Sequence, residues 1–439
     1  MTDRTLHILV YPWFAFGHLT PFLHMSNKLA DRGHKISFLL PKKAILKLES
    51  FNLHPCLITF IPITVPHVDG LPPGTETTAD VPFQLQHLLV TAMDLTEPVV
   101  EAHLLDLKPD LVFSDFACWL PTLARKMDVK SVQYCIVSSA TVGYLLRRES
   151  EIHDKRLIEA DLKQPPPGFP PSSIRLHAHE TRGLAAVHVS PSGSGMSFME
   201  RQLSSLEKCD AISFKTCVEM EGSYCNYVES AFGKPVILAG PVVPEPPNST
   251  LEEQFAKMLE KFQDGTLVFC AFGSECVLQK DQFQGHRSSL LLGLELTGIP
   301  FLAALKPPVG VETVESALPE GFGKRIQGRG FVYGGWVQQQ LILKHPSVGC
   351  FVTHCGSGSL SEVMINKCQI VLLPNFGDQL INARLMGGDL KVGVEVENDE
   401  ETGLFTRDGV YRAVKAVMDD DSEVGKEVRS NHTKWRDSF

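Results

Sequence analysis

Two residues in the first half of the sequence have the types and positions of a proton-transfer pair. His18 stands in the stretch YPWFAFGHLTP, just before a helical segment, and Asp115 follows the apolar run Leu111–Ser114. A neutral imidazole can accept a proton near pH 7, and a carboxylate behind it fixes its tautomer and stabilises the cation that forms. The ordinary alternatives are a capping or buried role for His18, and an Asp115 that caps a helix over Trp119–Lys126.

A second chemically competent group lies in the later half. An apolar run ends at Thr353, the small residues from His354 to Ser359 form a turn, and a helix is expected from Leu360. A strand, a glycine-rich turn and a helix N-terminus together aim backbone N–H groups at one point, which makes an anion site. His354 adds a donor and Ser359 a hydroxyl. Ser359 and Glu362 also fit a capping box, in which both would only close the helix start.

Alternating strands and helices must position these groups. We expect helices at Phe22–Ala30 and Phe83–Leu105, and an alternation of this kind predicts a parallel sheet covered on both faces. The expected strands are Leu6–Tyr11, Lys35–Leu40, Leu57–Ile63, Leu111–Ser114, Ser131–Ile136, Ala211–Thr216, Pro235–Ala239, Leu267–Phe272, Phe301–Leu305, Gly349–Thr353 and Ile370–Leu373.

Proline-rich segments punctuate this pattern. The run 165–171 (PPPGFPP) is interpreted as a surface loop within the first half, and the run 240–247 (GPVVPEPP) as a stiff linker. We therefore predict an N-terminal domain over 1–241, a linker over 242–252, a second domain over 253–422, and a C-terminal helix over 423–439 that starts back toward the first domain. Open parallel sheets bind ligands at the carboxyl ends of their strands, so we expect a ligand in a cleft between two doubly wound halves.

Composition excludes several classes of protein. With 43% hydrophobic and 21% charged residues, the chain has an ordinary globular composition, and its formal charge of −10 without a basic block argues against a nucleic-acid partner. The sequence has no run of about eighteen uncharged apolar residues, so we predict no membrane span. Eleven cysteines without metal-like spacing, in a chain without an export signal, predict a reduced, cytoplasmic protein. We also expect a monomer. We expect no bound metal, because no Asp-x-Asp motif follows a strand and the helix end supplies the positive field.

The segment from Trp336 to Gln379 carries a more specific signal. It resembles the C-terminal signature of plant family-1 UDP-sugar glycosyltransferases, and the G-H-x-x-P element at His18 and the run 323–336 are similar to that family as well. The resemblance implies the GT-B fold, which has two Rossmann-like α/β domains with doubly wound parallel sheets that face each other across a cleft. The matching residues are Trp336, Gln339, His345, Gly349, Phe351, Thr353, His354, Cys355, Gly356, Ser359, Glu362, Pro374, Asp378 and Gln379.

The resemblance also implies a role for each candidate residue. His18 would be the base and Asp115 its partner, no cofactor would be needed beyond the UDP-sugar co-substrate, and no metal would bind. The donor contacts would come from Trp336 and its neighbour Val337 at the uracil, Gln339 and Glu362 at the ribose, His354, Ser359 and Ser274 at the diphosphate, and Asp378 and Gln379 at the sugar. Taken singly, Trp336 could be a core residue, Gln339 a solvated helix residue and Asp378 a helix cap.

One departure from the family pattern bears on substrate choice. Ser357-Gly358 stands where the family most often has Trp-Asn, so the Gly358 backbone N–H would replace one contact and the other would be lost. This form resembles a subgroup that adds a second sugar to a glycoside. It implies an inverting transfer from a UDP-sugar to a hydroxyl of a small phenolic glycoside, such as a flavonoid or anthocyanin glycoside. The donor sugar stays open among glucose, xylose, rhamnose and other pentoses.

Three other functions are carried as alternatives. The first is direct O-glycosylation of a phenolic or terpenoid aglycone. The second is a UDP-sugar epimerase of similar fold, and the third is a UDP-sugar-binding protein without catalysis. The aromatic residues near His18 could line an acceptor pocket or belong to an ordinary core, and the irregular segment 164–190 is expected to add to the acceptor wall. These aromatic residues are Trp13, Phe14, Phe16 and Trp119.

Overall fold

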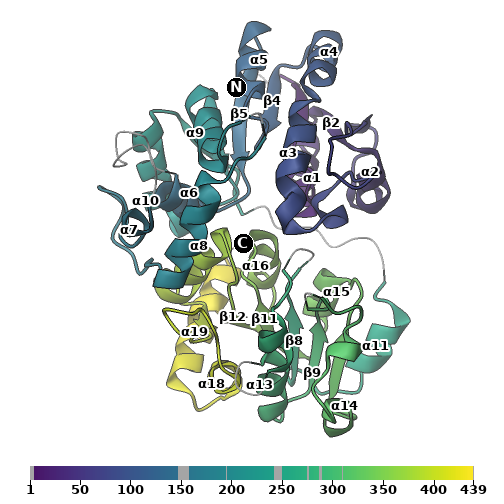
Figure 1. The fold of residues 1–439 in the computed structure, drawn as a ribbon, viewed down its shortest axis with the longest axis vertical. Coiled ribbons are helices and arrows are strands. Elements are labelled where there is room, and N and C mark those ends of the chain that lie inside the picture. Colours follow the sequence, from purple (N-terminus) through teal and green to yellow (C-terminus); the bar gives the residue numbers. More distant parts are fainter. Residues whose placement is uncertain are drawn as a thin grey trace. The chain divides into compact units, whose positions relative to one another are not determined.

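The structure, a computed structural model, describes residues 4–146, 158–193, 195–241, 250–273, 276–285, 289–308 and 310–438. The chain divides into two compact units. The first comprises Met1–Pro170 and Leu184–Pro247, and the second comprises Pro171–Gly183 and Asn248–Phe439. Each unit is built on one parallel β-sheet (Figure 1).

The first unit contains a seven-stranded sheet in the order β3-β2-β1-β4-β5-β6-β7. All its neighbouring strands are parallel, with Tyr11 of β1 in register with Ser114 of β4. The strands are β1 (His7–Tyr11), β2 (Lys35–Pro41), β3 (Ile58–Ile63), β4 (Leu111–Ser114), β5 (Lys130–Cys135), β6 (Ala211–Phe214) and β7 (Val236–Leu238). The helices that start in this unit are α1 (Phe16–Ala30), α2 (Lys42–Leu48), α3 (Gln86–Asp94), α4 (Glu97–Leu107), α5 (Leu120–Lys126), α6 (Ser139–Leu145), α7 (Glu159–Leu162), α9 (Phe198–Lys208) and α10 (Val218–Phe232).

The second unit contains a six-stranded parallel sheet in the order β10-β9-β8-β11-β12-β13. Its strands are β8 (Leu267–Ala271), β9 (Phe301–Ala304), β10 (Gly330–Tyr333), β11 (Val348–Thr353), β12 (Gln369–Leu372) and β13 (Gly393–Glu395). Helix α8 (Ala178–Val189) begins in this unit and ends in the first. The other helices are α11 (Glu253–Leu259), α12 (Lys280–Gln284), α13 (Leu290–Leu296), α14 (Phe322–Arg325), α15 (Gln339–Lys344), α16 (Ser357–Met364), α17 (Asp378–Arg384), a π-helical turn at Leu385–Asp389, α18 (Arg407–Met418) and α19 (Glu423–Arg436).

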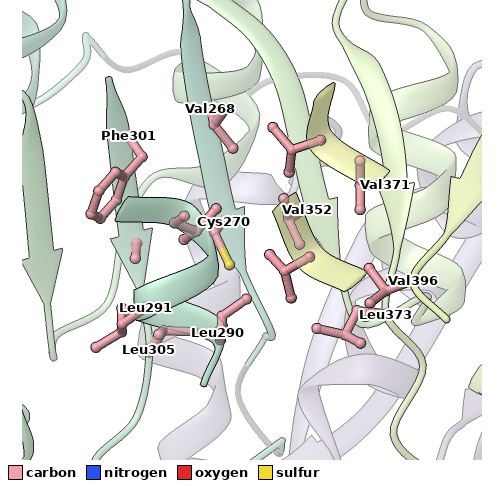
Figure 2. Close-up of a cluster of buried hydrophobic side chains, with 14 of the residues drawn as sticks. Val268, Cys270, Leu290, Leu291, Phe301, Leu305, Val352, Val371, Leu373 and Val396 are labelled. Carbon is pink, nitrogen blue, oxygen red and sulfur yellow. The ribbon is translucent and has the colours of Figure 1, made fainter. Parts of the chain in front are cut away.

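The apolar strands are buried on both faces, as a parallel sheet requires. Alternate residues of β1 contribute to two different hydrophobic clusters: Leu9 packs with helices α3 to α5, and Ile8 packs with α1 and α2. In the second unit, Figure 2 shows Val268 and Cys270 of β8 beside Val352 of β11 within one cluster, which α13 and α18 help to cover. The predicted fold class, a doubly wound parallel α/β sheet in each half, is therefore confirmed.

The strand order places a topological switch point in each sheet. In the first unit the chain runs outward in opposite directions from β1 and β4, and in the second unit from β8 and β11. The loops that follow two such strands diverge, which leaves a crevice at their carboxyl ends where ligands bind in doubly wound folds. His18 and Asp115 follow β1 and β4, and His354 follows β11.

Two predicted helices differ from those observed. Helix α1 begins at Phe16 rather than Phe22, because Pro21, which lacks an N–H, lies within the helix without ending it. The single helix expected over Phe83–Leu105 is divided into a short 3-10 turn, α3 and α4, and Pro98 lies in the first turn of α4, where it cannot donate to a preceding carbonyl. Strands β10 and β13 were not predicted; both lie at sheet edges and contain half-buried residues.

The remaining predictions concern the linker, the segment after the first proline-rich run, the cysteines and a membrane span. Residues 242–249 of the predicted linker lie outside the described residues. The segment Pro171–Gly183, which lies within the predicted N-terminal domain over 1–241, belongs to the second unit. The contribution of residues 164–190 to an acceptor wall stays a prediction. None of the eleven cysteines forms a disulfide. Within the described ranges, no helix combines the length and the apolar character that crossing a membrane requires.

Candidate active site

The first unit brings His18 and Asp115 into direct contact. His18 Nδ1 lies 2.5 Å from Asp115 Oδ2, and both side chains are largely buried. The register between β1 and β4 places the loops after them side by side, which explains how two residues 97 positions apart can meet. His18 is the third residue of α1 and lies in its first turn, rather than before the helix as predicted.

Backbone groups hold the Asp115 carboxylate in place. Its Oδ1 accepts hydrogen bonds from the N–H groups of Trp13 and Phe116, both at 2.8 Å, while Gln133 Nε2 donates to the Asp115 carbonyl. Helix α5 starts at Leu120 without a side-chain cap, so the alternative that Asp115 caps it is wrong. The buried carboxylate is therefore oriented by both strands' loops and directed at the imidazole.

This geometry assigns different tasks to the two ring nitrogens of His18. A carboxylate only accepts hydrogen bonds, so the neutral ring carries its proton on Nδ1 and presents an unprotonated Nε2. Nε2 has no hydrogen-bond partner within the described part of the chain. The Phe116 ring packs edge-to-face against the imidazole, with centroids 5.2 Å apart. The arrangement can take a proton from a hydroxyl placed at Nε2 and stabilise the resulting cation through Asp115.

The aromatic residues around this pair divide into two groups. Trp13 and Phe14 are buried, and Trp13 stacks on Phe116 at a centroid distance of 5.2 Å, which fits the core alternative for these two residues. Phe16 and Trp119 are only partly buried. The Trp119 indole N–H is enclosed without a partner among the described residues, although a buried indole N–H usually has one.

In the second unit, helix α16 starts without a side-chain cap. It begins at Ser357 with Gly356 as its N-cap residue, three residues earlier than expected. Ser359 is therefore the third helical residue rather than the cap, and the capping-box alternative for Ser359 and Glu362 is wrong. The N–H groups of the first turn, including that of Gly358, remain available to an anion together with the positive end of the helix dipole.

His354 is packed against this helix start by two glycines. A Cβ on Gly356 would lie 2.6 Å from His354 Nε2, which would force the ring to move, and one on Gly273, whose φ is 66°, would make a tight 3.1 Å contact with Cε1. Burial lowers the pKa of His354 to about 4, with a smaller opposing effect from a hydrogen bond with the Ala271 backbone. The ring is therefore neutral at physiological pH and acts as a hydrogen-bond donor or acceptor rather than as a cation.

A network of amides surrounds the Glu362 carboxylate. Gln339 Nε2 donates to Glu362 Oε2 at 2.6 Å and to Ser359 Oγ at 3.0 Å, and Gln340 Nε2 donates to Glu362 Oε1 at 3.2 Å. These contacts join the start of α15 to α16 and bring together three of the predicted site residues. Gln339 is thus not a solvated helix residue, as its ordinary alternative supposed.

Trp336 lies in the loop between β10 and α15, with Val337 beside it. The residue is 71% exposed, so it is not the core residue of the alternative interpretation. An exposed indole face is a suitable platform for stacking a planar base. Val337 is half-buried, and its carbonyl accepts the Gln339 N–H at 2.9 Å, which shapes the turn into α15.

Asp378 and Gln379 open helix α17. Asn382 Nδ2 donates to Asp378 Oδ2 at 2.9 Å and to the Cys355 carbonyl at 3.1 Å, which links Asp378 to the turn beside His354. Gln379 Oε1 accepts the N–H groups of Asn375 and Phe376, at 3.1 and 3.2 Å. The N-cap residue is Gly377, so the capping alternative for Asp378 is wrong. Ser274, the remaining predicted contact, lies outside the described residues.

Sequence reasoning missed several residues that support this site. Asn382, Gln340 and Gln133 each orient a predicted site residue. Their elements carry other polar residues as well, so no local pattern singled them out. Gln133 and Gln340 contact partners 18 and 22 positions away, beyond the reach of local periodicity, whereas Asn382 contacts Asp378 one helical turn away as well as the more distant Cys355 carbonyl.

Two units, each built on a doubly wound parallel sheet with candidate site residues at its switch point, have the architecture of GT-B glycosyltransferases. The model of the UDP-glucoronosyl and UDP-glucosyl transferase family matches residues 325–429. A cyanidin 3-O-galactoside 2''-O-xylosyltransferase from Actinidia chinensis var. chinensis is 61% identical over 437 residues, covering 100% of this chain and 95% of that protein. The chain belongs to this family.

Further relatives and solved structures agree with this assignment. An anthocyanidin 3-O-glucoside 2''-O-glucosyltransferase from Ipomoea purpurea is 56% identical, with 98% of this chain and 93% of that protein covered. The crystal structure of Glycyrrhiza uralensis UGT73P12 has a TM-score of 0.81 at 19% identity, covering 99% of this chain and 91% of that one. The structure of a UDP-glucose: anthocyanidin 3-O-glucosyltransferase with UDP has a TM-score of 0.75 at 24% identity, covering 100% and 94%. The structural likenesses support the fold.

Proposed function

We propose that this protein transfers a sugar from a UDP-sugar to a hydroxyl on the existing sugar of a flavonoid or anthocyanin glycoside. The catalytic part of the proposal depends on one observation, the 2.5 Å contact between His18 Nδ1 and the buried Asp115 carboxylate. The acceptor is supported by relatives at 61%, 56% and 52% identity, whose names all specify transfer to the sugar of an anthocyanidin-type 3-O-glycoside.

The proposed reaction is a single displacement with inversion. His18 Nε2 takes the proton of the acceptor hydroxyl while its oxygen attacks the anomeric carbon from the face opposite the diphosphate. The bond between the anomeric carbon and the diphosphate oxygen breaks, and the electron pair leaves with UDP. Asp115 stabilises the imidazolium, and no covalent intermediate forms between protein and sugar.

Charge that develops on the leaving UDP is to be stabilised in the second unit. His354, Ser359, the Gly358 N–H and the N-terminus of α16 supply donors without a cationic side chain, and Ser274 is proposed to join them. We propose that the reaction requires no metal ion and no cofactor, so EDTA should leave the rate unchanged. A large loss of rate in EDTA would contradict this part.

Nucleotide and sugar are proposed to bind along the second unit's switch-point loops. Trp336 stacks on the uracil beside Val337, while Gln339 and Glu362 bind the ribose hydroxyls. Asp378 and Gln379 bind the hydroxyls of the donor sugar, for which a carboxylate and an amide are suited because together they accept and donate. We further propose a cytoplasmic monomer.

The donor sugar is the least constrained part of the proposal. The named relatives include both xylosyl- and glucosyltransferases, so similarity alone does not choose between a pentose and a hexose. Gly358 has no atom within 4 Å of where its Cβ would be, so the structure leaves open space where a larger residue could stand. We propose UDP-xylose and UDP-glucose as the first donors to test.

A donor-by-acceptor screen tests the function. UDP-glucose, UDP-xylose, UDP-rhamnose and other UDP-pentoses would be paired with anthocyanidins, flavonols and their 3-O-monoglycosides, with products identified by mass and linkage. We expect a disaccharide product from a glycoside acceptor. Products only from aglycones would support direct O-glycosylation, an altered UDP-sugar without acceptor would indicate an epimerase, and binding without turnover would indicate a non-catalytic protein.

A further inference from the structure

A short segment from the first half of the sequence is docked on the second unit. We call residues Pro171–Gly183 the strap; they belong to the second unit, although the chain on either side belongs to the first. Ser173 attaches one end of the strap: its N–H donates to Asp389 Oδ1 at 2.7 Å and its Oγ to the Arg384 carbonyl at 3.2 Å. Gly388 leaves room for this contact, since a Cβ there would collide with Ser173.

The centre of the strap is held by a buried cluster of charges. Glu180 Oε1 lies 2.7 Å from an Arg384 nitrogen, and the same guanidinium binds Glu395. The Glu180 side chain is completely buried and that of Arg384 is 9% exposed. The second Glu180 oxygen accepts the His177 N–H at 2.7 Å, which fixes the carboxylate at the start of α8.

The charge balance of this cluster favours the contact with the strap. Two carboxylates share one guanidinium, and burial, opposed by Arg384 and reinforced by Glu180, raises the pKa of Glu395 to about 7. Near neutral pH, Glu395 is partly protonated. The positive charge of Arg384 is then balanced mainly by the single negative charge of Glu180. Removal of the Glu180 charge would leave the guanidinium dependent on Glu395, which is the more exposed partner.

Arg384 connects this cluster to the sugar end of the site. It is the last residue of α17, the helix whose first two residues are Asp378 and Gln379. The strap also approaches the loop before the helix, where a Cβ on Gly183 would lie 3.8 Å from Phe376 Cε2. The Phe376 N–H is itself bound by Gln379 Oε1. The strap therefore contacts α17 at its C-terminal residue, Arg384, and passes near the loop that precedes the helix.

We propose that Glu180 is a positioning residue that, through Arg384, sets helix α17 so that Asp378 and Gln379 reach the donor sugar. The proposal rests on the proposed function for the identity of the ligand. Among the described residues, those assigned to uracil, ribose and diphosphate lie on other elements: the loop before α15, the start of α15, the turn before α16, and α16 itself. Disturbing Glu180 should therefore weaken recognition of the sugar more than recognition of UDP, to which α17 is linked through the Asn382 hydrogen bond to the Cys355 carbonyl.

Calorimetric titration of the Glu180→Gln variant with UDP, UDP-glucose and UDP-xylose tests this proposal. We expect the Kd for UDP to stay near that of the wild type and the ratio of the UDP-sugar Kd to the UDP Kd to rise about 10-fold, because small misplacements of positioning groups have effects of at least this order. Glu180→Asp should restore part of the ratio. Equal weakening for UDP and UDP-sugar, or no change in either, would overturn the proposal.

Hydrogen exchange gives a readout that does not depend on nucleotide binding. In the free Glu180→Gln protein, amides of residues 378–384 should exchange faster than in the wild type, whereas amides of β8 and β11 should not. The matched control is Glu401→Gln, which removes the exposed ion pair with Arg182 on the same strap and should change nothing. Unchanged exchange in α17 would count against the proposal.

Two further outcomes remain decisive. If Glu180→Gln does not fold, Ser173→Ala removes the milder contact with the Arg384 carbonyl, and faster exchange in α17 is expected again; unchanged exchange would overturn the positioning role.

If the wild-type protein binds neither UDP nor UDP-sugar, the proposed function fails, and faster exchange in α17 would still support the coupling between the strap and the helix.

Discussion

At the scale of single residues, the imidazole of His18 is the group on which turnover should depend. His18→Ala removes the acceptor of the proton and should lower kcat by about 10²- to 10⁴-fold, the usual contribution of a general base. The Kd for UDP should be unchanged, because no UDP contact is assigned to His18. Steady-state kinetics with the best donor and acceptor, together with a UDP titration, measure both. Turnover close to that of the wild type would remove His18 from the role of base.

Gln340 helps to orient the carboxylate of Glu362, the residue proposed to bind the ribose. Its amide and that of Gln339 hold the two oxygens of Glu362 separately, so the carboxylate has one orientation. Gln340 Oε1 is buried without a partner among the described residues. The reversed amide orientation would place an oxygen against the carboxylate, so the Glu362 contact fixes which atom is Nε2.

Gln340→Leu should therefore weaken ribose recognition. Loss of one hydrogen bond to a charged group is worth about 1.5 kcal/mol or more, so we expect the Kd for UDP to rise about 10-fold and that for 2′-deoxy-UDP to rise less. Calorimetric titrations with both nucleotides compare the two. Gln338→Leu is the matched control, because Gln338 instead binds the backbone of Glu252 and Thr250. Equal losses for both nucleotides would contradict an effect through the ribose.

At the scale of elements, one of the two glycines at the start of α16, Gly356, determines how closely His354 packs there. Gly356 and Gly358 are two residues apart, yet a Cβ on Gly356 would strike the His354 ring at 2.6 Å and one on Gly358 would meet nothing within 4 Å. Cys355, between His354 and the helix, adopts a φ of 65°, which residues with side chains rarely do. A tight turn thus sets His354 beside the free N–H groups of the helix.

The two glycines give a matched pair of variants. Gly356→Ala should displace His354 and weaken UDP binding about 10-fold or more, since one charge-assisted hydrogen bond is at stake. Gly358→Ala keeps the backbone N–H and should leave the affinity unchanged while stabilising the helix by a few tenths of a kcal/mol to about 1 kcal/mol. UDP titrations and thermal unfolding of both variants measure these effects. A Gly356→Ala protein that binds UDP normally would show that His354 has no part in binding.

At the scale of the whole molecule, buried histidines connect stability to pH. Burial, with help from Lys215 and Lys28, lowers the pKa of His24 to about 4. The unfolded chain, in which His24 titrates near pH 6.5, therefore binds more protons than the folded chain between pH 6.5 and pH 4. The contribution of His24 to the free energy of unfolding must fall as the pH is lowered through that window.

This effect is measurable by urea unfolding at pH 7 and pH 5. We expect the loss of stability on acidification to be smaller in His24→Gln than in the wild type, by on the order of 1–2 kcal/mol. The control is His67→Gln, because the His67 side chain is 66% exposed and its removal should not alter the difference between the two pH values. Identical losses in His24→Gln and the wild type would show that His24 titrates normally in the folded state.

The local sequence pattern was enough to predict the buried strands and the family resemblance, because both depend on residues that are close together in the chain. Apolar runs such as HILVY and LVFCA are buried strands because a parallel sheet hides both faces, and the spacing from Trp336 to Gln379 carries the family resemblance by itself. The short edge strands β10 and β13 were missed; their burial is incomplete, and β10 has no fully buried residue. The broken helix over Phe83–Leu105 shows that one proline can divide an otherwise continuous pattern.

The sequence by itself determined the doubly wound sheets, the family, and which residue types are available for proton transfer and anion binding. Only the tertiary structure decided what each side chain touches. Ser359 and Glu362 have the spacing of a capping box but bind Gln339, and Glu180 joins the second unit through Arg384, 204 positions away. The physical reason is that periodicity records which face of an element is buried, whereas a hydrogen-bond partner is chosen by whichever element the folded chain brings alongside.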